Sequence, residues 1–311
     1  MNNRNRILLF MAAILLVTGF GACKHKKQPA KTEDSFMAGT ADFLIDESLS
    51  PIIDEEEFVF GSLYTEAKPH MVYKSENQAL NLLLNDSIRF AILARDLKPD
   101  EKKLMERRTL PATVNVFAHD AIALIVNQSS ADTNITVSEV KNMLNGKSKS
   151  DLNIVFDNPN SSLVRYLKEL SGSTELNAKN IYALKSNKEV VKYVSEHPKS
   201  IGIVGFAWLN DPDKDYAADV QKVRIMGVKD DTKNKDDNGF TKPSQESLAL
   251  KTYPLSRDIY IINCTNKQGL GTGFEGFLLS DRGQRIVLKS GLLPAKMPGR
   301  EINIVTQQPT Q

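Results

Sequence analysis

Short apolar runs alternate with amphipathic segments from about Asp42 onward, and this alternation limits the possible folds more than any other feature of the sequence. Several runs lack polar residues at every second position, which is typical of strands that are covered on both faces of a sheet. The order of strand and helix patterns predicts an α/β architecture. The candidate strands are residues 71–74, 90–93, 121–126, 153–156, 201–204 and 259–263.

Helix starts are marked by capping boxes, in which Ser or Thr is followed three residues later by Glu or Gln. Such boxes occur at residues 75–78, 136–139 and 186–189. The helix that begins at the second box is expected to stop at Gly146, because glycine accepts the left-handed conformation that ends many helices.

The charge balance excludes one class of partner. The chain has 311 residues, enough for one large or two ordinary domains, and its 40 Lys and Arg nearly equal its 38 Asp and Glu. Aromatic residues are sparse, and the sequence has no basic stripe with interleaved aromatic residues. We therefore do not expect nucleic acid as a partner.

The N-terminus has the pattern of an export signal. Arg4 and Arg6 precede an apolar stretch at residues 7–20, and Gly-Ala-Cys follows, ending at Cys23. The stretch is short for a membrane-spanning helix, and residues 24–40 are mostly polar. This order resembles the bacterial lipoprotein signal, in which the cysteine thiol receives the lipid.

The export signal leads to expectations about location. We expect a signal peptide at 1–22, lipidation of Cys23, a tether at 23–39 and a lipid-anchored protein of the cell envelope, which touches the membrane only through that lipid. Phe20 departs from the usual leucine three residues before the cysteine. An uncleaved anchor or an ordinary secretory signal is the alternative. Cys264 then has no partner for a disulfide and is expected to be a buried thiol.

Two predicted strands run into polar turns that open helices. Residue 74 leads into Ser75, and residue 156 leads into the turn 157–162. Ligands of open α/β sheets lie beyond the carboxyl ends of the strands, where free N–H groups at helix starts favour an anion. Any one turn is also explained by ordinary helix capping. Two or more turns facing one cleft would instead indicate a binding site.

Several blocks in the mature chain, taken in order, resemble PstS-type phosphate-binding proteins. The clearest is YPLSRDIYI at 253–261, followed by FLLSDRGQRIV at 277–287 and GLLP at 291–294. Further blocks lie at 120–127, 134–147 and 200–208. Together they cover most of residues 40–296 with the family's spacing.

The resemblance implies a class II periplasmic binding protein fold, with two α/β lobes joined by hinge strands. The first lobe would comprise 40–121 plus 254–303 and the second 122–253, with a C-terminal tail at 304–311. Residues 277–288 would form one helix. Family members hold dehydrated phosphate without a metal, using hydroxyls, backbone N–H groups and an arginine.

The family's four site loops indicate candidate ligand-binding residues in this chain. By resemblance, hydroxyl and amide donors come from the first, second and fourth loops, and a cation comes from the third. The candidates are Ser48; Ser75 and Asn77; Arg95; and Asn160, Ser161 and Ser162. Arg165 lies one position beyond the family's arginine.

Acidic residues replace the family's glycine-rich turns at Glu47, Glu76 and Asp157. Glycine lets the backbone approach an anion closely, whereas carboxylates repel a doubly charged ligand. One carboxylate would help if it accepted the proton of hydrogenphosphate, which would also reject sulfate. Three such groups at one point would not suit phosphate.

The predicted function is capture of phosphate or a related oxyanion for an ABC permease, by a monomer without a cofactor or metal. The alternative is a degenerate binding protein that holds another ligand or serves an envelope partner. The acidic residues favour that alternative.

Catalysis is not expected. The four histidines lack metal-binding spacing, and no G-x-S-x-G motif occurs. The glycine-rich residues 269–273 lack the strand-to-helix context of a nucleotide loop and are predicted to form a flexible loop.

Overall fold

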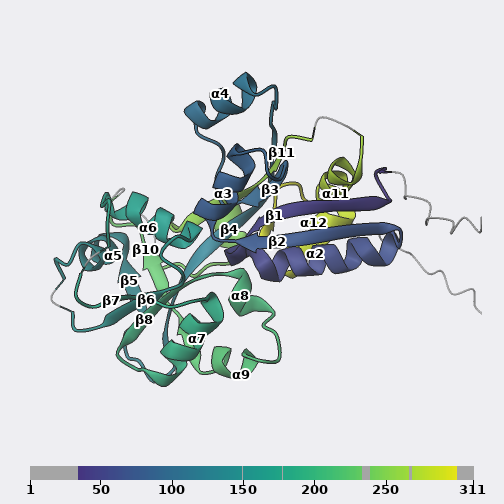
Figure 1. The fold of residues 1–311 in the computed structure, drawn as a ribbon. Helices are drawn as coiled ribbons and strands as arrows, with labels where there is room; N and C mark the ends of the chain where they lie inside the picture. The colour runs from purple at the N-terminus through teal and green to yellow at the C-terminus, as the bar shows by residue number, and fades with distance from the viewer. Residues whose placement is uncertain (1–33, 149, 177, 233–238, 266–267, 300–311) are drawn as a thin grey trace, which may run out of the picture. The chain divides into compact units, whose positions relative to one another are not determined.

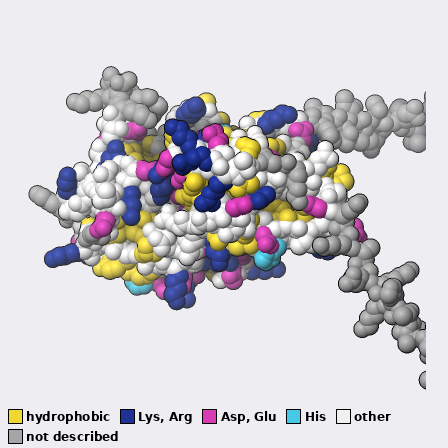
Figure 2. Space-filling view, turned by 45° about the horizontal axis from the view of Figure 1, so that its top comes forward, with side chains coloured by type: hydrophobic (Ala, Val, Ile, Leu, Met, Phe, Trp, Pro, Cys, Tyr) yellow, Lys and Arg dark blue, Asp and Glu magenta, His cyan; other side chains and the backbone are white. Residues whose placement is uncertain are grey.

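The computed structural model describes residues 34–299, apart from 149, 177, 233–238 and 266–267. The predicted signal peptide at 1–22, the lipidation of Cys23, most of the tether and the tail at 304–311 lie outside the described residues. Within the described part of the chain, no helix is long and apolar enough to cross a membrane. On the face shown in Figure 2, Lys and Arg side chains lie among Asp and Glu side chains.

The strands follow the expected alternation with helices. They are β1 (Gly39–Asp46), β2 (Ala67–Lys74), β3 (Phe90–Leu93), β4 (Thr113–Asn127), β5 (Asn134–Thr136), β6 (Asn153–Phe156), β7 (Ile181–Ala183), β8 (Ser200–Gly205), β9 (Val223–Ile225), β10 (Gly227–Lys229), β11 (Ser256–Asn263) and β12 (Leu293–Pro294).

The helices include one short 3-10 turn, η2 (Glu47–Leu49). The α-helices are α2 (Ser50–Leu63), α3 (Glu76–Leu84), α4 (Pro99–Arg107), α5 (Val137–Leu144), α6 (Ser162–Ser171), α7 (Asn187–Glu196), α8 (Ala207–Asn210), α9 (Ala217–Val220), α10 (Gln245–Ala249), α11 (Leu270–Leu278) and α12 (Asp281–Lys289).

Strand β4 joins two groups of strands (Figure 1). The strand order is β2-β1-β3-β11-β4-β8-β6-β7. Residues 113–121 of β4 pair with β11, and residues 122–126 pair with β8. We call β1, β2, β3 and their helices α2, α3, α11 and α12 lobe 1, and β6, β7, β8 and their helices α5, α6 and α7 lobe 2. The predicted two-lobed α/β fold is confirmed, while the predicted chain boundaries of the lobes stay a prediction.

The predicted strands lie within observed ones, and the differences have local causes. β3 and β6 have the predicted limits, but β2 begins at Ala67 rather than at residue 71. β2 is the edge strand of lobe 1 and pairs only with β1 in the strand order. An edge position tolerates Pro69 and polar side chains. The first half of β2 therefore has no apolar run, and the prediction from apolar runs begins only at residue 71.

The predicted helix over 277–288 is wrong, because the structure has two helices there. α11 ends at Leu278, and the Ser280 hydroxyl caps α12 by accepting from the Gly283 N–H at 3.4 Å. A Cβ at Gly283 would lie 2.5 Å from the Phe277 carbonyl oxygen. The glycine therefore permits the start of α12 to pack closely against the end of α11.

The predicted flexible loop at 269–273 is also wrong, because these residues open α11. The Asp34 carboxylate accepts a hydrogen bond from the Leu270 N–H at 2.9 Å. A Cβ at Gly273 would lie 1.9 Å from the Phe36 carbonyl oxygen. The glycine-rich stretch thus accommodates close packing of the segment before β1.

An aromatic cluster fixes helices on the sheet of lobe 1. Phe43 of β1 contacts Phe90 of β3 and Phe274 of α11, with ring centroids 4.8 and 5.0 Å apart. Phe60 of α2 meets Phe274 at 5.1 Å, and all four rings are buried. Burial of large aromatic rings is a major stabilising contribution, so α2 has a fixed position on the sheet.

Glu56 is an exception within this core. It lies on the buried face of α2 and is 0 % exposed, and neither carboxylate oxygen has a hydrogen-bond partner among the described residues. Burial, with a smaller contribution from Glu55, raises the pKa of Glu56 from 4.5 to about 9. Folding therefore takes up a proton between these pH values. The favourable contribution of the neutral form is complete below pH 4.5 and is lost as the pH rises toward 9.

The variant Glu56→Gln tests this titration. We expect its free energy of unfolding, relative to that of the unsubstituted protein, to rise by about 1.4 kcal/mol per pH unit between roughly pH 5 and 8, because the amide cannot ionise. Urea unfolding at several pH values measures the difference. The variant Glu106→Gln, at an exposed position of α4, is the control, and a difference that stays flat with pH in Glu56→Gln would contradict the account.

Candidate functional site

The candidate site is built around Arg257, a buried cation on β11. Its side chain is 3 % exposed, and its Nε donates to Asp120 Oδ2 at 2.9 Å while Nη2 lies 2.8 Å from the same oxygen. Asp120 is on β4, and its other oxygen accepts from the Ala121 N–H at 2.8 Å. Asp120 lies where β4 passes from its pairing with β11 to its pairing with β8 of lobe 2, so the ion pair lies at the junction of the lobes.

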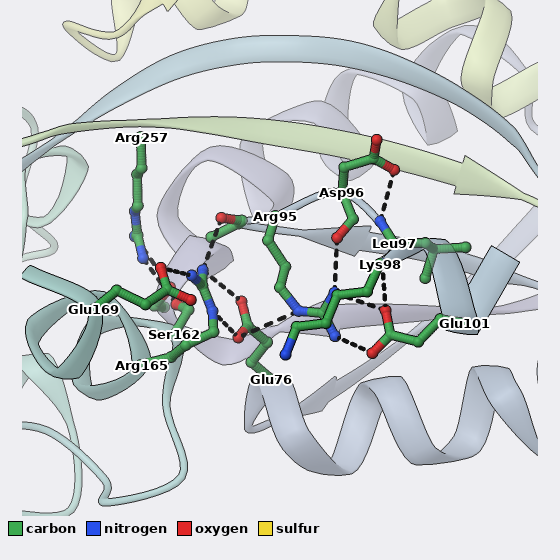
Figure 3. Close-up of polar contacts among 12 residues, drawn as sticks. Glu76, Arg95, Asp96, Leu97, Lys98, Glu101, Ser162, Arg165, Glu169 and Arg257 are labelled. Carbon is green, nitrogen blue, oxygen red and sulfur yellow. Dashed lines mark hydrogen bonds and ion pairs between the residues drawn. The ribbon is translucent and has the colours of Figure 1, made fainter. Parts of the chain in front are cut away.

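Two serine hydroxyls complete this arrangement, one from each lobe. Arg257 Nη1 donates to Ser162 Oγ at 2.8 Å, and Nη2 donates to Ser48 Oγ at 3.2 Å. The hydroxyls of Ser48 and Ser162 lie 3.0 Å apart and hydrogen-bond to each other. All four residues are at most 6 % exposed. We call Asp120, Arg257, Ser48 and Ser162 the hinge cluster; Figure 3 shows Arg257 beside Ser162.

The hydroxyls come from helix starts that follow strand ends. Ser48 lies in η2, between the end of β1 and the start of α2, and Ser162 is the first residue of α6. Ser161 caps α6 by accepting from the Val164 N–H at 3.2 Å. Helix N-termini favour negative charge, and two from different lobes meet here. This convergence goes beyond ordinary capping.

Two buried polar atoms near the cluster lack partners among the described residues. Asp46 Oδ1 accepts from the Ser48 N–H at 3.0 Å, but Oδ2 has no hydrogen-bond partner there. The hydroxyl of Ser75, directly before α3, is likewise unpaired there. An unsatisfied buried polar group costs about 1–3 kcal/mol, so both atoms are candidates for contact with a ligand.

The acidic residue at the start of α3 is neutralised across the lobes (Figure 3). Arg165 of α6 donates from Nε to Glu76 Oε1 at 2.5 Å and from Nη2 to Oε2 at 3.1 Å. Arg165 Nη2 also donates to the Ala94 carbonyl at 3.0 Å. Arg95 Nε lies 3.9 Å from Glu76, but its terminal nitrogens bind Glu101 at 2.7 and 2.8 Å. Both arginines are therefore already engaged by carboxylates.

The other two acidic substitutions have neutral hydrogen-bond partners. Asp157 accepts from Ser161 Oγ at 2.5 Å and from Asn187 Nδ2 at 3.1 Å. Burial, reinforced by the charge of Asp46, raises the pKa of Asp157 to about 7. Glu47 accepts from Asn158 Nδ2 across the lobes at 2.9 Å, and burial raises its pKa as well.

The structure brings only some of the predicted site residues together. Ser48, Ser161 and Ser162 lie in or beside the hinge cluster, and Ser75 is buried at the start of α3. Asn77 and Asn160 are exposed and meet through the Asn77 N–H and the Asn160 carbonyl at 3.5 Å. Arg95 faces Glu101 rather than the hinge cluster.

Sequence reasoning missed the central cation. Arg257 stands two residues before Ile259 in β11, and alternation along a strand places both side chains on the same face. Both are buried. An arginine on the apolar face of a strand needs a buried anion, and this requirement was the available signal.

A double-mutant cycle tests the Arg257–Asp120 pair. We expect Arg257→Met and Asp120→Asn each to lower the free energy of unfolding by about 3–5 kcal/mol, because either change leaves a buried charge unpaired. The double variant should lose less than the sum of the two. Strictly additive losses in urea unfolding would show that the ion pair is not coupled.

Comparisons with known proteins place this chain among relatives of known type. A phosphate-binding protein PstS from Borreliella burgdorferi is 26% identical over 271 residues, covering 80% of this chain and 88% of that protein. The crystal structure of a putative phosphate ABC transporter substrate-binding protein with bound phosphate from Clostridium perfringens has a TM-score of 0.69 at 19% identity, covering 83% of this chain and 100% of the other.

A further solved structure, an ABC-type phosphate transport receptor from Vibrio cholerae, has a TM-score of 0.63 at 18% identity, covering 81% of this chain and 99% of that one. At these identities the structures establish the fold. A family model described as the PBP superfamily domain matches residues 28–282. Since that match spans most of the chain, this protein belongs to the family that the model describes, the PBP superfamily domain.

Proposed function

We propose that this protein captures an oxyanion, phosphate in the first instance, and delivers it to an ABC permease. The observation that carries the proposal is the hinge cluster, in which a buried guanidinium meets a hydroxyl from each lobe. The relatives support the choice of ligand, because they are named phosphate-binding proteins or phosphate transport receptors.

The hinge cluster supplies the donors that a dehydrated oxyanion needs. An anion entering it would replace the direct Ser48–Ser162 hydrogen bond, so that each hydroxyl donates to a different oxygen. Arg257 would add charge-assisted hydrogen bonds, which are stronger than neutral ones. Asp120 would keep the guanidinium in place through Nε. The N-termini of α2 and α6 would add favourable dipoles.

A ligand that binds between the lobes would shift the equilibrium between their open and closed arrangements. One anion would contact Ser48 from lobe 1 and Ser162 from lobe 2 together with Arg257 of the hinge strand. A ligand shifts a conformational equilibrium only as far as it binds one state better than the other. Because the full set of donors is assembled only when the lobes meet, the ligand would favour the closed form that a permease recognises.

Asp46 would distinguish hydrogenphosphate from sulfate. Its Oδ2 is a buried acceptor without a partner among the described residues, directly before the η2 turn that carries Ser48. A protonated phosphate oxygen can donate to this atom, whereas fully ionised sulfate can only repel it.

A second candidate, a binding protein that has lost phosphate, is favoured by the carboxylates around the cluster. Glu76 engages Arg165 and lies near Arg95, and it occupies the start of α3 where an anion would otherwise be favoured. Such a protein would hold another ligand or serve an envelope partner.

Isothermal titration calorimetry with phosphate separates these functions. We expect phosphate to bind, and we expect Ser162→Ala to weaken binding by roughly tenfold, the loss of about one hydrogen bond to a charged group. Ser171→Ala, at the opposite end of the same helix, is the control. Absence of heat with phosphate, sulfate and arsenate would remove transport as the function.

We also propose that the protein acts as a monomer at the cell envelope, held by a lipid on Cys23. The evidence is the signal pattern of the first residues, with the polar stretch that follows it. In a bacterial host supplied with labelled palmitate, the full-length protein should incorporate label and fractionate with membranes. Cys23→Ala should do neither, and label retained in that variant would argue against this anchor.

A further inference from the structure

A cavity of about 310 Å³ lies between the two lobes, separate in its lining from the hinge cluster. Lobe 1 contributes Glu47 and Asp54 among others, and the other side contributes Asp157, Lys185 and Trp208. Inorganic phosphate in the hinge cluster would leave this space unused. A cavity of this size is within the range that accommodates an organic substituent.

The cavity adjoins the hinge cluster at three points. Glu47 directly precedes Ser48 in the chain, and Trp208 donates from Nε1 to the Ser48 carbonyl at 2.8 Å. Asp157 accepts from the hydroxyl of Ser161, the neighbour of Ser162. A ligand held by the two serine hydroxyls would therefore extend a substituent into the cavity without leaving the space between the lobes.

The charge of the lining favours a cation. Three carboxylates line the cavity, against one lysine. Their hydrogen-bond partners are neutral: Asn158 for Glu47, the Tyr73 hydroxyl for Asp54, and Ser161 and Asn187 for Asp157. Glu76 differs, because arginine neutralises it. Burial raises the pKa of all three carboxyl groups, so an ammonium group in the cavity would favour their ionised form, whereas a second anion would oppose it.

We propose that the ligand is zwitterionic, with its oxyanion on the hinge cluster and an ammonium group in this cavity. An aminoalkyl phosphonate or an amine-bearing phosphate monoester has this chemistry. The inference rests on the proposed function, since it takes the hinge cluster as the oxyanion site. It also gives the acidic residues Glu47 and Asp157 a role, because the ligand's ammonium group balances charges that bare phosphate would face alone.

Calorimetry on the purified protein with four probes tests this inference. The probes are 2-aminoethylphosphonate, ethylphosphonate, O-phosphoethanolamine and inorganic phosphate. We expect both amine-bearing compounds to bind at least roughly tenfold more tightly than ethylphosphonate and phosphate, the scale of one charge-assisted partner. Glu47→Gln and Asp54→Asn should each reduce this preference severalfold. Glu57→Gln, one turn further along α2 and outside the cavity lining, should retain it.

Three other results of this calorimetry would overturn part or all of the proposal. Phosphate binding that equals or exceeds binding of the amine compounds overturns the zwitterion inference and leaves the proposed function standing. Binding of none of the four probes overturns both. A preference for the amines that is unchanged in both Glu47→Gln and Asp54→Asn overturns the placement of the ammonium group in this cavity.

Discussion

A buried guanidinium needs a fixed anion and further polar partners, and this constraint on Arg257 organises the site. Asp120 supplies the anion from the neighbouring hinge strand, so the pair has the same position in relation to both lobes. The remaining N–H groups then require acceptors, which Ser48 and Ser162 provide from helix starts in different lobes. The arrangement of these donors in the structure therefore depends on one ion pair.

The acidic residues around this pair have two kinds of hydrogen-bond partner, arginine for Glu76 and neutral side chains for Glu47 and Asp157. Glu76 is neutralised by Arg165 across the lobes, which adds a second link between α3 and α6. Asp157 and Glu47 have neutral partners, and burial raises the pKa of both. The first arrangement pairs a carboxylate with a cation, while the second leaves two carboxyl groups at the edge of the hinge cluster whose ionisation burial opposes.

Much of the fold could be predicted from local patterns, whereas the centre of the site could not. Apolar runs located β3 and β6 because strands covered on both faces carry apolar side chains at consecutive positions. The capping box at Thr136 located α5 because its reciprocal hydrogen bonds are local. Ser48 and Ser162 could be proposed by resemblance to the family's site loops, and Ser162 also from the polar turn before its helix. Their meeting with Arg257 depends on long-range packing of segments that are 95 to 209 residues apart, which no local pattern encodes. Arg95 was predicted as the cation by resemblance to the family's third site loop, but in this structure its terminal nitrogens bind Glu101.

A crystal structure of the protein grown with phosphate tests the central claim most directly. The account predicts density for the anion between the lobes, within hydrogen-bonding distance of the Arg257 guanidinium and of both serine hydroxyls, with the Ser48–Ser162 hydrogen bond broken and the Arg257–Asp120 pair intact. Phosphate bound elsewhere, while Arg257 still donates to Ser48 and Ser162 as it does here, would contradict it.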